Sequence, residues 1–324
     1  MEILSGLDAL RSLPRGAVLT IGNYDGVHLG HRRILETCRN LARRSCAGQV
    51  AVITFEPHPL TVLRPEAAPP RLTPPSLKER ELCLAGVNFL VVLPADASVL
   101  NLSAEEFWAI LREDVAPAAI VEGEEFFFGR DRAGNSETLR RWATDAGIAV
   151  EVVPAVRVAL TDLSLVRVSS SLVRWLLLNG RARDAAICLG RPYTLEGEVT
   201  VGRKRGRTLG VPTANLRCTG QLIPADGVYV GRCAIADRAY PTAVSIGTMP
   251  TFNETVRTVE AHLVGFEGDL YGRTLQVSLI DWIREQRRFE SVEALKARMA
   301  QDIEWTVRRQ DLNPAAQIVS AETH

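Results

Sequence analysis

The chain has 324 residues, of which 46% are hydrophobic, 23% charged and 6% aromatic. This composition is typical of a globular protein and excludes a disordered or collagen-like chain. Lys plus Arg and Asp plus Glu each number 38, so the net charge of zero excludes a global basic field for nucleic acid. At roughly 150 residues per domain, the length predicts about two domains.

The sequence also predicts the compartment. No apolar stretch approaches the roughly 18–20 residues of a membrane span, and the N-terminal residues have the pattern of neither a signal nor a transit peptide. The six cysteines form no Cys-x-x-Cys pair and match no zinc spacing. We therefore expect a cytoplasmic protein with free thiols and no membrane partner.

The first half of the chain alternates short apolar runs with helical periods. Such alternation predicts a doubly wound parallel sheet with helices on both faces, because parallel strands need crossover connections. Ligands of such sheets bind at the carboxyl ends of the strands. The predicted strands are residues 17–21, 50–55, 88–93, 118–121 and 149–153, and the predicted helices are 29–44, 77–84, 104–112 and 137–146.

The second half changes character after about Gly190. Short β-rich runs separated by turn residues predict a small β-barrel or sandwich closed by a C-terminal helix. The segment 172–189 is expected to be helical and to join the two halves, and the Pro-rich segment 64–75 is expected to be a loop. The predicted strands are 194–201, 228–235, 242–246, 255–264 and 274–280, and the predicted helix is 292–307.

One motif lies between the first predicted strand and the first predicted helix, where the sequence reads GNYDGVHLGH. Its glycines allow a tight turn and a close approach to a ligand, and the helix N-terminus suits phosphate. His28 and His31 are three residues apart and can face one phosphate chain, whereas metal binding is disfavoured because no third ligand is near. The predicted nucleotide-binding residues of this loop are Gly22, Asn23, Asp25, Gly26 and Gly30.

A second group of candidates precedes the helical segment at 172–189. Ser169, Ser170 and Ser171 either only cap that helix or also reach phosphate oxygens. Arg174, in the first turns, can supply a forked cation to the same phosphates.

Two further segments of the first half have open interpretations. His58, between two prolines, either lines a nucleotide or flavin pocket or only closes a loop. The aromatic run 126–128 is interpreted first as core packing, with an exposed ring against a flavin as the alternative.

The second half has a basic, glycine-rich string, GRKRGRTLGVPTAN, at residues 202–215. A run of Lys and Arg usually forms a solvated face or attracts nucleic acid, but the glycines and the Pro-Thr-Ala-Asn turn favour a phosphate flap. Mg²⁺ prefers oxygen ligands, which a Thr hydroxyl and an Asn carbonyl supply. The predicted nucleotide-binding residues are Gly202, Gly206, Arg207, Gly210, Pro212, Thr213 and Asn215, and the predicted metal ligands are Thr213 and Asn215.

Together these strings resemble the bacterial bifunctional riboflavin kinase/FAD synthetase family. The first half carries the H-x-G-H string, TFEPHP at 54–59, EGEEFFFG at 122–129 and VSSSLVR at 168–174. The second half carries the PTAN string, PADGVY at 224–229 and SIGTMPTF at 245–252. The sequence departs from the family pattern at Tyr24 (usually Phe), Ser171 (usually Thr) and Glu125 (usually Asp or Asn).

The resemblance implies a fold and a pair of reactions. Residues 1–186 would form a nucleotidylyltransferase-like α/β domain, residues 187–310 a riboflavin kinase-like six-stranded β-barrel with a C-terminal helix, and residues 311–324 a tail. The implied activity is ATP-dependent phosphorylation of riboflavin to FMN, followed by adenylylation of FMN to FAD with release of pyrophosphate. The alternatives are a kinase with an inactive adenylyltransferase half and a non-catalytic flavin- or RNA-binding regulator.

The resemblance also implies roles for single residues. Glu260 would be the general base for the ribityl hydroxyl, although a carboxylate on the polar face of a barrel strand is more often only solvated. His262, on the same strand face, we expect to be structural. His28, His31 and Arg174, with Mg²⁺, would neutralise phosphate charge in adenylyl transfer. The implied partners are riboflavin, FMN and ATP, without nucleic acid, and the implied flavin contacts are His58, Glu125 and Phe128.

Overall fold

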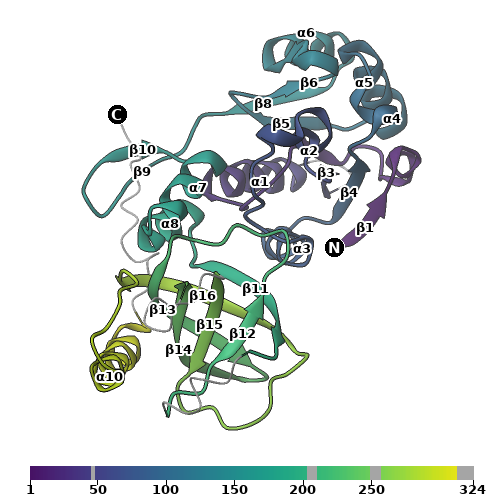
Figure 1. Ribbon diagram of the computed structural model, residues 1–324. Coiled ribbons are helices and arrows are strands. Elements are labelled where there is room, and N and C mark those ends of the chain that lie inside the picture. The colour runs from purple at the N-terminus through teal and green to yellow at the C-terminus, as the bar shows by residue number, and fades with distance from the viewer. Residues whose placement is uncertain (45–47, 203–209, 249–256, 312–324) are drawn as a thin grey trace. The chain divides into compact units, whose positions relative to one another are not determined.

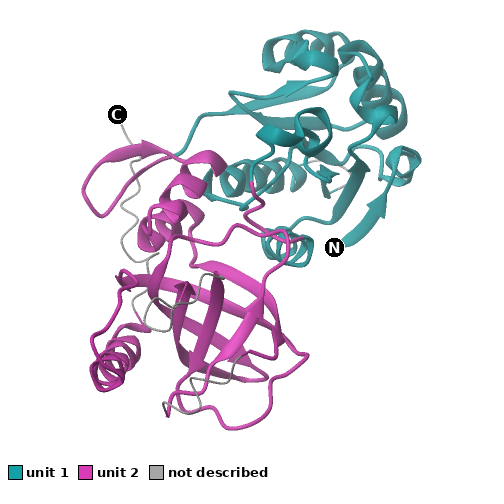
Figure 2. Ribbon diagram, viewed as in Figure 1, with its two compact units in different colours: residues 1–69, 75–156 teal, residues 70–74, 157–324 magenta. Residues whose placement is uncertain are grey.

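The computed structural model describes residues 1–44, 48–202, 210–248 and 257–311. The chain folds as two compact units (Figure 2). Unit 1 comprises Met1–Pro69 and Pro75–Val156, and unit 2 comprises Pro70–Pro74 and Arg157–His324. Among the described residues, no helix is both long and apolar enough to cross a membrane.

A six-stranded sheet forms the centre of unit 1 (Figure 1). All of its pairings are parallel, in the order β1-β4-β3-β2-β5-β8. The prediction of a parallel sheet is confirmed, with one edge strand more than the sequence indicated. The strands are β1 (Glu2–Ser5), β2 (Val18–Ile21), β3 (Val50–Glu56), β4 (Phe89–Pro94), β5 (Ala119–Gly123) and β8 (Ala149–Val153).

Apolar side chains cover both faces of this sheet, as the alternating pattern predicted. Leu19 and Ile21 of β2 pack into one cluster with Phe107 and Leu139, whereas Val18 packs into another with Cys38. Successive residues of one strand thus bury on opposite faces, against helices on either side. The helices are α1 (Leu29–Ala42), α2 (Pro59–Leu63), α3 (Pro75–Leu84), α4 (Ala97–Leu100), α5 (Ala104–Ile110, continued by a π-helical turn to Val115) and α6 (Ser136–Asp145).

Unit 2 is built around a closed antiparallel barrel of six strands, in the order β11-β12-β15-β14-β13-β16 (Figure 1). The barrel, rather than the sandwich, is therefore the correct alternative. Burial alternates strictly along β11 and β15, so every second side chain of these strands lies in the core. The strands are β11 (Tyr193–Thr200), β12 (Ala214–Arg217), β13 (Gly227–Ile235), β14 (Arg238–Gly247), β15 (Thr258–Leu263) and β16 (Thr274–Arg284).

The segment predicted as one helix at 172–189 consists of two, and this prediction is corrected. α7 (Ser170–Leu178) and α8 (Ala182–Leu189) are separated at Gly180, whose φ of 73° no continuous right-handed helix adopts. Both helices lie in unit 2, as does an unpredicted hairpin of β9 (Arg157–Ala159) and β10 (Leu165–Arg167). A smaller hairpin, β6 (Phe127–Phe128) and β7 (Gly134–Asn135), lies in unit 1.

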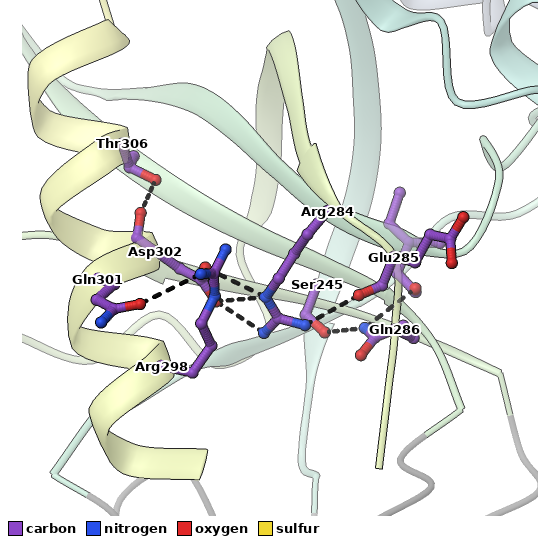
Figure 3. A network of polar contacts seen from close by, with 9 residues as sticks. Ser245, Arg284, Glu285, Gln286, Arg298, Gln301, Asp302 and Thr306 are labelled. Carbon is purple, nitrogen blue, oxygen red and sulfur yellow. Dashed lines mark hydrogen bonds and ion pairs between the residues drawn. The ribbon is translucent and has the colours of Figure 1, made fainter. Parts of the chain in front are cut away.

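The C-terminal helix α10 (Val292–Arg309) is held to the barrel by a buried ionic cluster (Figure 3). Arg284, at the end of β16, donates to the Asp302 carboxylate from Nε at 3.0 Å and from a terminal nitrogen at 2.7 Å. Arg298 lies 3.0 Å from the other oxygen of Asp302. The Asp302 side chain is only 5% exposed, so the two arginines are its countercharges in place of water.

A short segment from the predicted Pro-rich loop belongs by its contacts to unit 2. Pro70–Pro74, called the strap here, forms a parallel bridge between Arg71 and Gln221. The Gln221 amide donates to the Leu72 carbonyl at 3.2 Å, and the Leu222 amide donates to the Arg71 carbonyl at 2.7 Å. These bonds attach the strap to residues Gln221 and Leu222, which follow β12.

Candidate functional site

The loop between β2 and α1 has an unusual backbone. Tyr24 and Val27 have φ values of 49° and 40°, and Gly26 between them has a φ of 88°. A β-branched residue in this region is a genuine conformational outlier. Tyr24 and Val27 are both buried, and the Tyr24 hydroxyl lies 2.7 Å from the Thr20 hydroxyl. The surrounding packing therefore holds the loop in a conformation that the isolated chain would not favour, which is common at ligand sites.

The two histidines of this loop lie together, as predicted. His28 is the N-cap of α1, and its Nδ1 accepts the His31 backbone N–H at 3.3 Å. The imidazole rings stack with centroids 3.7 Å apart and an interplanar angle of 14°. With Nδ1 as acceptor, the proton of a neutral His28 is on Nε2, which makes this nitrogen a donor. Two such rings at a helix N-terminus form a site suited to an anion.

The start of the loop is fixed on both sides. The Gly22 amide donates to the Ile53 carbonyl of β3 at 2.9 Å, and the Thr54 hydroxyl donates to the Asn23 carbonyl at 3.2 Å. On the other side, the Ile21 amide donates to the Glu122 carboxylate of β5 at 2.7 Å. The loop therefore leaves the sheet at a fixed position rather than as a free connection.

His58 also reaches this loop. It is the N-cap of α2, where its Nδ1 accepts the Leu60 amide at 3.2 Å, and its Nε2 lies 3.2 Å from Asn23 Nδ2. The contact joins the TFEPHP motif to the GNYDGVHLGH motif of unit 1. It supports a pocket position for His58 in addition to loop closure.

The aromatic run divides between core and surface. The Phe128 ring is 6% exposed and packs against Phe126, Phe107 and Trp142. Phe127 is 44% exposed, with the Arg132 guanidinium above its ring. Glu125 is exposed. Flavin contacts of Phe128 and Glu125 stay predictions, and the ring that faces solvent is Phe127.

The serines and Arg174 lie in unit 2. Ser169 caps α7 by accepting the Leu172 amide at 3.1 Å, and Ser170 and Ser171 begin the helix. Arg174 Nε donates to the Pro70 carbonyl of the strap at 2.8 Å. The predicted capping role of Ser169 is confirmed, whereas phosphate contacts of the serines and of Arg174 stay predictions.

Three polar residues of the barrel meet at Glu260. Asn215 of β12 and Ser245 of β14 lie directly opposite Glu260 of β15, on either side of it in the sheet. The Thr213 hydroxyl donates to Glu260 Oε2 at 3.1 Å. Directly opposite residues share one face of a sheet, so the register brings the predicted metal ligands and the predicted base together. Glu260 lies on the half-exposed face of β15, whose other face is buried.

His262, two residues further along β15, has a structural contact. Its Nδ1 lies 2.7 Å from the Pro212 carbonyl, and because a carbonyl only accepts, Nδ1 is the donor. This bond holds the backbone at Pro212, directly before Thr213, in a fixed position. It supports the structural role that we predicted for His262.

The donor atoms around Glu260 fit a hard divalent cation. The Thr213 hydroxyl, the Asn215 amide and the Glu260 carboxylate supply oxygen, which Mg²⁺ and similar ions prefer. A Cβ built on Gly202 would lie 2.1 Å from the Asn215 amide nitrogen, so a larger residue there would displace the Asn215 side chain. No cluster of three or more His, Cys, Asp or Glu residues suited to a metal occurs within the described ranges. Gly206 and Arg207 lie outside them, while Gly210 has a φ of 82°.

Several residues of these sites stood only inside longer motifs of the sequence, or outside any motif, and no role was predicted for them individually. Glu122, Thr54 and Ser245 are ordinary strand residues whose roles depend on their partners across the sheet. For Glu122 a signal existed, because a carboxylate at the end of a fully apolar strand is rarely buried without a reason. Gln286, which donates to the Ser245 hydroxyl at 2.7 Å, follows β16 and had no sequence signal.

Comparison with known proteins covers both units. Residues 189–309 match the family described as riboflavin kinase, and residues 10–170 match the family described as FAD synthetase. The bifunctional riboflavin kinase/FMN adenylyltransferase of Pseudomonas fluorescens is 37% identical over 94% of this chain and 96% of that protein. The protein of the same name from Escherichia coli (strain K12) is 35% identical over 93% of this chain and 96% of that protein.

A solved structure agrees with these relatives in extent. It is described as a macrolide-efflux protein from Streptococcus pneumoniae, has a TM-score of 0.83 and 30% identity, and covers 95% of this chain and 99% of that chain. Both halves of the chain thus match known proteins in the same order. The chain belongs to the bifunctional riboflavin kinase/FMN adenylyltransferase family.

Proposed function

We propose that this chain phosphorylates riboflavin to FMN with ATP and then adenylylates FMN to FAD. The observation that carries the proposal is the presence, in one chain, of the stacked His28–His31 pair at a helix N-terminus and the Thr213–Glu260 contact in the barrel. Family membership supports both reactions. No observation favours an inactive adenylyltransferase half or a non-catalytic regulator.

In the kinase reaction, the ribityl 5′-hydroxyl attacks the γ-phosphorus of ATP, the bond to the β-phosphate oxygen breaks, and ADP leaves. Glu260 accepts or orients the hydroxyl proton, which is the role of a general base. The Thr213 hydroxyl already donates its proton to Glu260, so its oxygen lone pairs are left for a cation. A divalent cation held by Thr213 and Asn215, for which we propose Mg²⁺, would offset phosphoryl charge.

In the adenylyltransferase reaction, a phosphate oxygen of FMN attacks the α-phosphorus of ATP, and pyrophosphate leaves. FMN brings its own nucleophile, so the protein has to position the two substrates and offset negative charge. His28 and His31 supply hydrogen-bond donors at the N-terminus of α1, where the helix dipole is positive. We assign Gly22, Asn23, Asp25, Gly26 and Gly30 to the ATP loop, and His58, Glu125 and Phe128 to the flavin side.

Ser169, Ser170, Ser171 and Arg174 complete the proposed phosphate contacts of this reaction. We also propose that the two activities divide near residue 186, that the enzyme works in the cytoplasm, and that it binds neither nucleic acid nor membrane. The zero net charge supports the lack of a nucleic-acid partner.

The test is to incubate the purified full-length chain with riboflavin, ATP and Mg²⁺ and to separate the three flavins by chromatography. We expect FMN to appear first and FAD to follow. Accumulation of FMN without FAD would limit the function to the kinase, and unchanged riboflavin would refute both activities. Omission of the divalent cation is the control and should stop both steps.

A further inference from the structure

The sheet of unit 1 opens between β2 and β5. The register of these two strands ends at Leu19 and Ile120. β2 nevertheless continues to Ile21 alongside β3, and β5 continues to Gly123 alongside β8. The two central strands therefore lose their mutual pairing while each keeps its other neighbour.

This opening lies where a ligand is expected. The connections from β2 lead to β3 and β4 on one side, whereas β5 and β8 lie on the other, so the strand order reverses between β2 and β5. Ligands of open α/β sheets bind at such a point, outside the carboxyl ends of the strands. The β2–α1 loop with His28 and His31 starts at this edge.

The buried side chain of Glu122 bridges the opening. The Glu122 carboxylate accepts the Ile21 N–H at 2.7 Å, in the place of the backbone carbonyl that a continued ladder would offer. Glu122 is 2% exposed, so it is too deeply buried to be a surface contact for substrate.

We infer that Glu122 is a positioning residue of the adenylyltransferase site, which fixes the end of β2 and so the strained loop that receives the ATP phosphates. The inference rests on the proposed function. On the β3 side, the main chain of Gly22 and the hydroxyl of Thr54 hold the start of the loop, and on the β5 side Glu122 holds it. Without the Glu122 bond, Ile21 would keep a buried, unpaired N–H, and the end of β2 would lose its side-chain anchor on the β5 side.

The experiment compares two variants in the full-length chain. Glu122→Leu keeps the size but removes the acceptor, and Glu122→Gln keeps an acceptor oxygen. For FAD formation from FMN, we expect Glu122→Leu to raise KM for ATP about tenfold, the effect of one lost hydrogen bond. We expect Glu122→Gln to restore KM to within about twofold of the wild type. FMN formation from riboflavin, measured in the same proteins, is the folding control and should not change.

Two results would overturn the inference. One is an unchanged KM for ATP in Glu122→Leu, and the other is an equal loss in Glu122→Gln, because glutamine retains the acceptor. If Glu122→Leu does not fold, amide hydrogen exchange of the wild type decides. We expect Ile21 N–H to exchange as slowly as that of Leu19, and rapid exchange would reject the bond. A wild-type chain that forms no FAD would refute the proposed function itself, while the exchange measurement would still test the bond.

Discussion

At the scale of single residues, Glu260 occupies a place that its sequence neighbours do not explain. It lies between Asn215 and Ser245 in the sheet, and Thr213 donates to it. A solvated carboxylate on a strand would have no such set of partners. Its surroundings combine an acceptor for a proton with oxygen ligands for a cation, which is what transfer of a phosphoryl group to a hydroxyl requires.

Replacing Glu260 should separate the two activities. We expect Glu260→Gln to slow FMN formation by about 100-fold or more, because glutamine cannot accept the hydroxyl proton. Turnover is measured as FMN formed from riboflavin and ATP. The control is FAD formation from supplied FMN, which should be unchanged. Kinase turnover within twofold of wild type would remove Glu260 from this role.

The complementary change is His28→Ala. Loss of the imidazole removes both a donor to phosphate and the N-cap of α1, so we expect FAD formation from FMN to fall by about 100-fold. FMN formation from riboflavin should stay at the wild-type rate. Chromatography of the flavins gives both rates in one experiment, and an equal loss of both would contradict a division of the two sites.

Glu122 should also give the protein a specific dependence of stability on pH. Burial raises its pKa well above the ordinary 4.5. As the pH rises above about 4.5, the unfolded carboxyl ionises while the folded one keeps its proton, so the wild type loses up to about 1.4 kcal/mol of stability per pH unit until the folded pKa is passed. Glutamine does not titrate. We therefore expect Glu122→Gln to be more stable than wild type at neutral pH, with the difference vanishing at low pH.

Urea denaturation at about pH 4, 5.5 and 7 measures this difference. All other carboxylates are common to both proteins and cancel. A difference in the free energy of unfolding that is the same at every pH would show that folding does not raise the pKa of Glu122.

The kinds of residue at each site could be predicted from the sequence, but their contacts could not. Glycines, histidines and the Pro-Thr-Ala-Asn turn indicate phosphate and cation chemistry through local geometry alone. The Thr213–Glu260 bond joins residues 47 positions apart and depends on the register of β12 against β15. The Glu122–Ile21 bond spans 101 positions and depends on where two strands part.

At the scale of elements, strands with a strong local pattern could be predicted from the sequence, whereas strands that depend on distant partners could not. The buried central strands of unit 1 were predicted within about two residues, because continuous apolar runs need both faces covered. β1 was not predicted, because it is an edge strand with mostly exposed residues. β12 was not predicted either, because its sequence has the pattern of a turn. Its residues form a strand through their pairing with β11 and β15. α7 and α8 have continuous helical periodicity, and the break at Gly180 is a matter of backbone conformation.

The attachment of α10 to the barrel gives a prediction of stability. We expect Asp302→Asn to lower the free energy of unfolding by about 3 kcal/mol, because Arg284 and Arg298 would lose the carboxylate that neutralises them in a buried place. Chemical denaturation measures the change. The matched control on the same helix is Glu304→Gln, whose ion pair with Arg308 is solvent-exposed and should contribute less than about 0.5 kcal/mol. Equal effects of the two substitutions would contradict a structural role for the cluster.

At the scale of the whole molecule, the histidine pair and the Glu260 centre are built on different compact units, while the proposed phosphate contacts Ser169–Ser171 and Arg174 belong to unit 2. His28 and His31 belong to unit 1, and Thr213, Asn215 and Glu260 belong to unit 2. Each centre obtains its geometry from the sheet or barrel that carries it. This organisation predicts that a defect in one centre does not disable the other.

Mixing two defective proteins tests that independence directly. Neither Glu260→Gln nor His28→Ala alone should convert riboflavin to FAD. Together, we expect them to form FAD, since the His28→Ala protein makes FMN and the Glu260→Gln protein adenylylates it. The yield of FAD from riboflavin in the mixture, against each protein alone, is the measurement. A mixture as inactive as its components would mean that FMN does not pass between molecules.

The strap has a consequence for how the chain can be divided. The main chain passes from one unit to the other three times, on either side of Pro70–Pro74 and after Val156. After a protease nick following Val156, the strap would remain in the first fragment. Its hydrogen-bond partners, Gln221 and Leu222, would belong to the second fragment. A kinase fragment expressed by itself would lack the strap, and a synthetic peptide of the strap sequence is the natural complement to supply in trans.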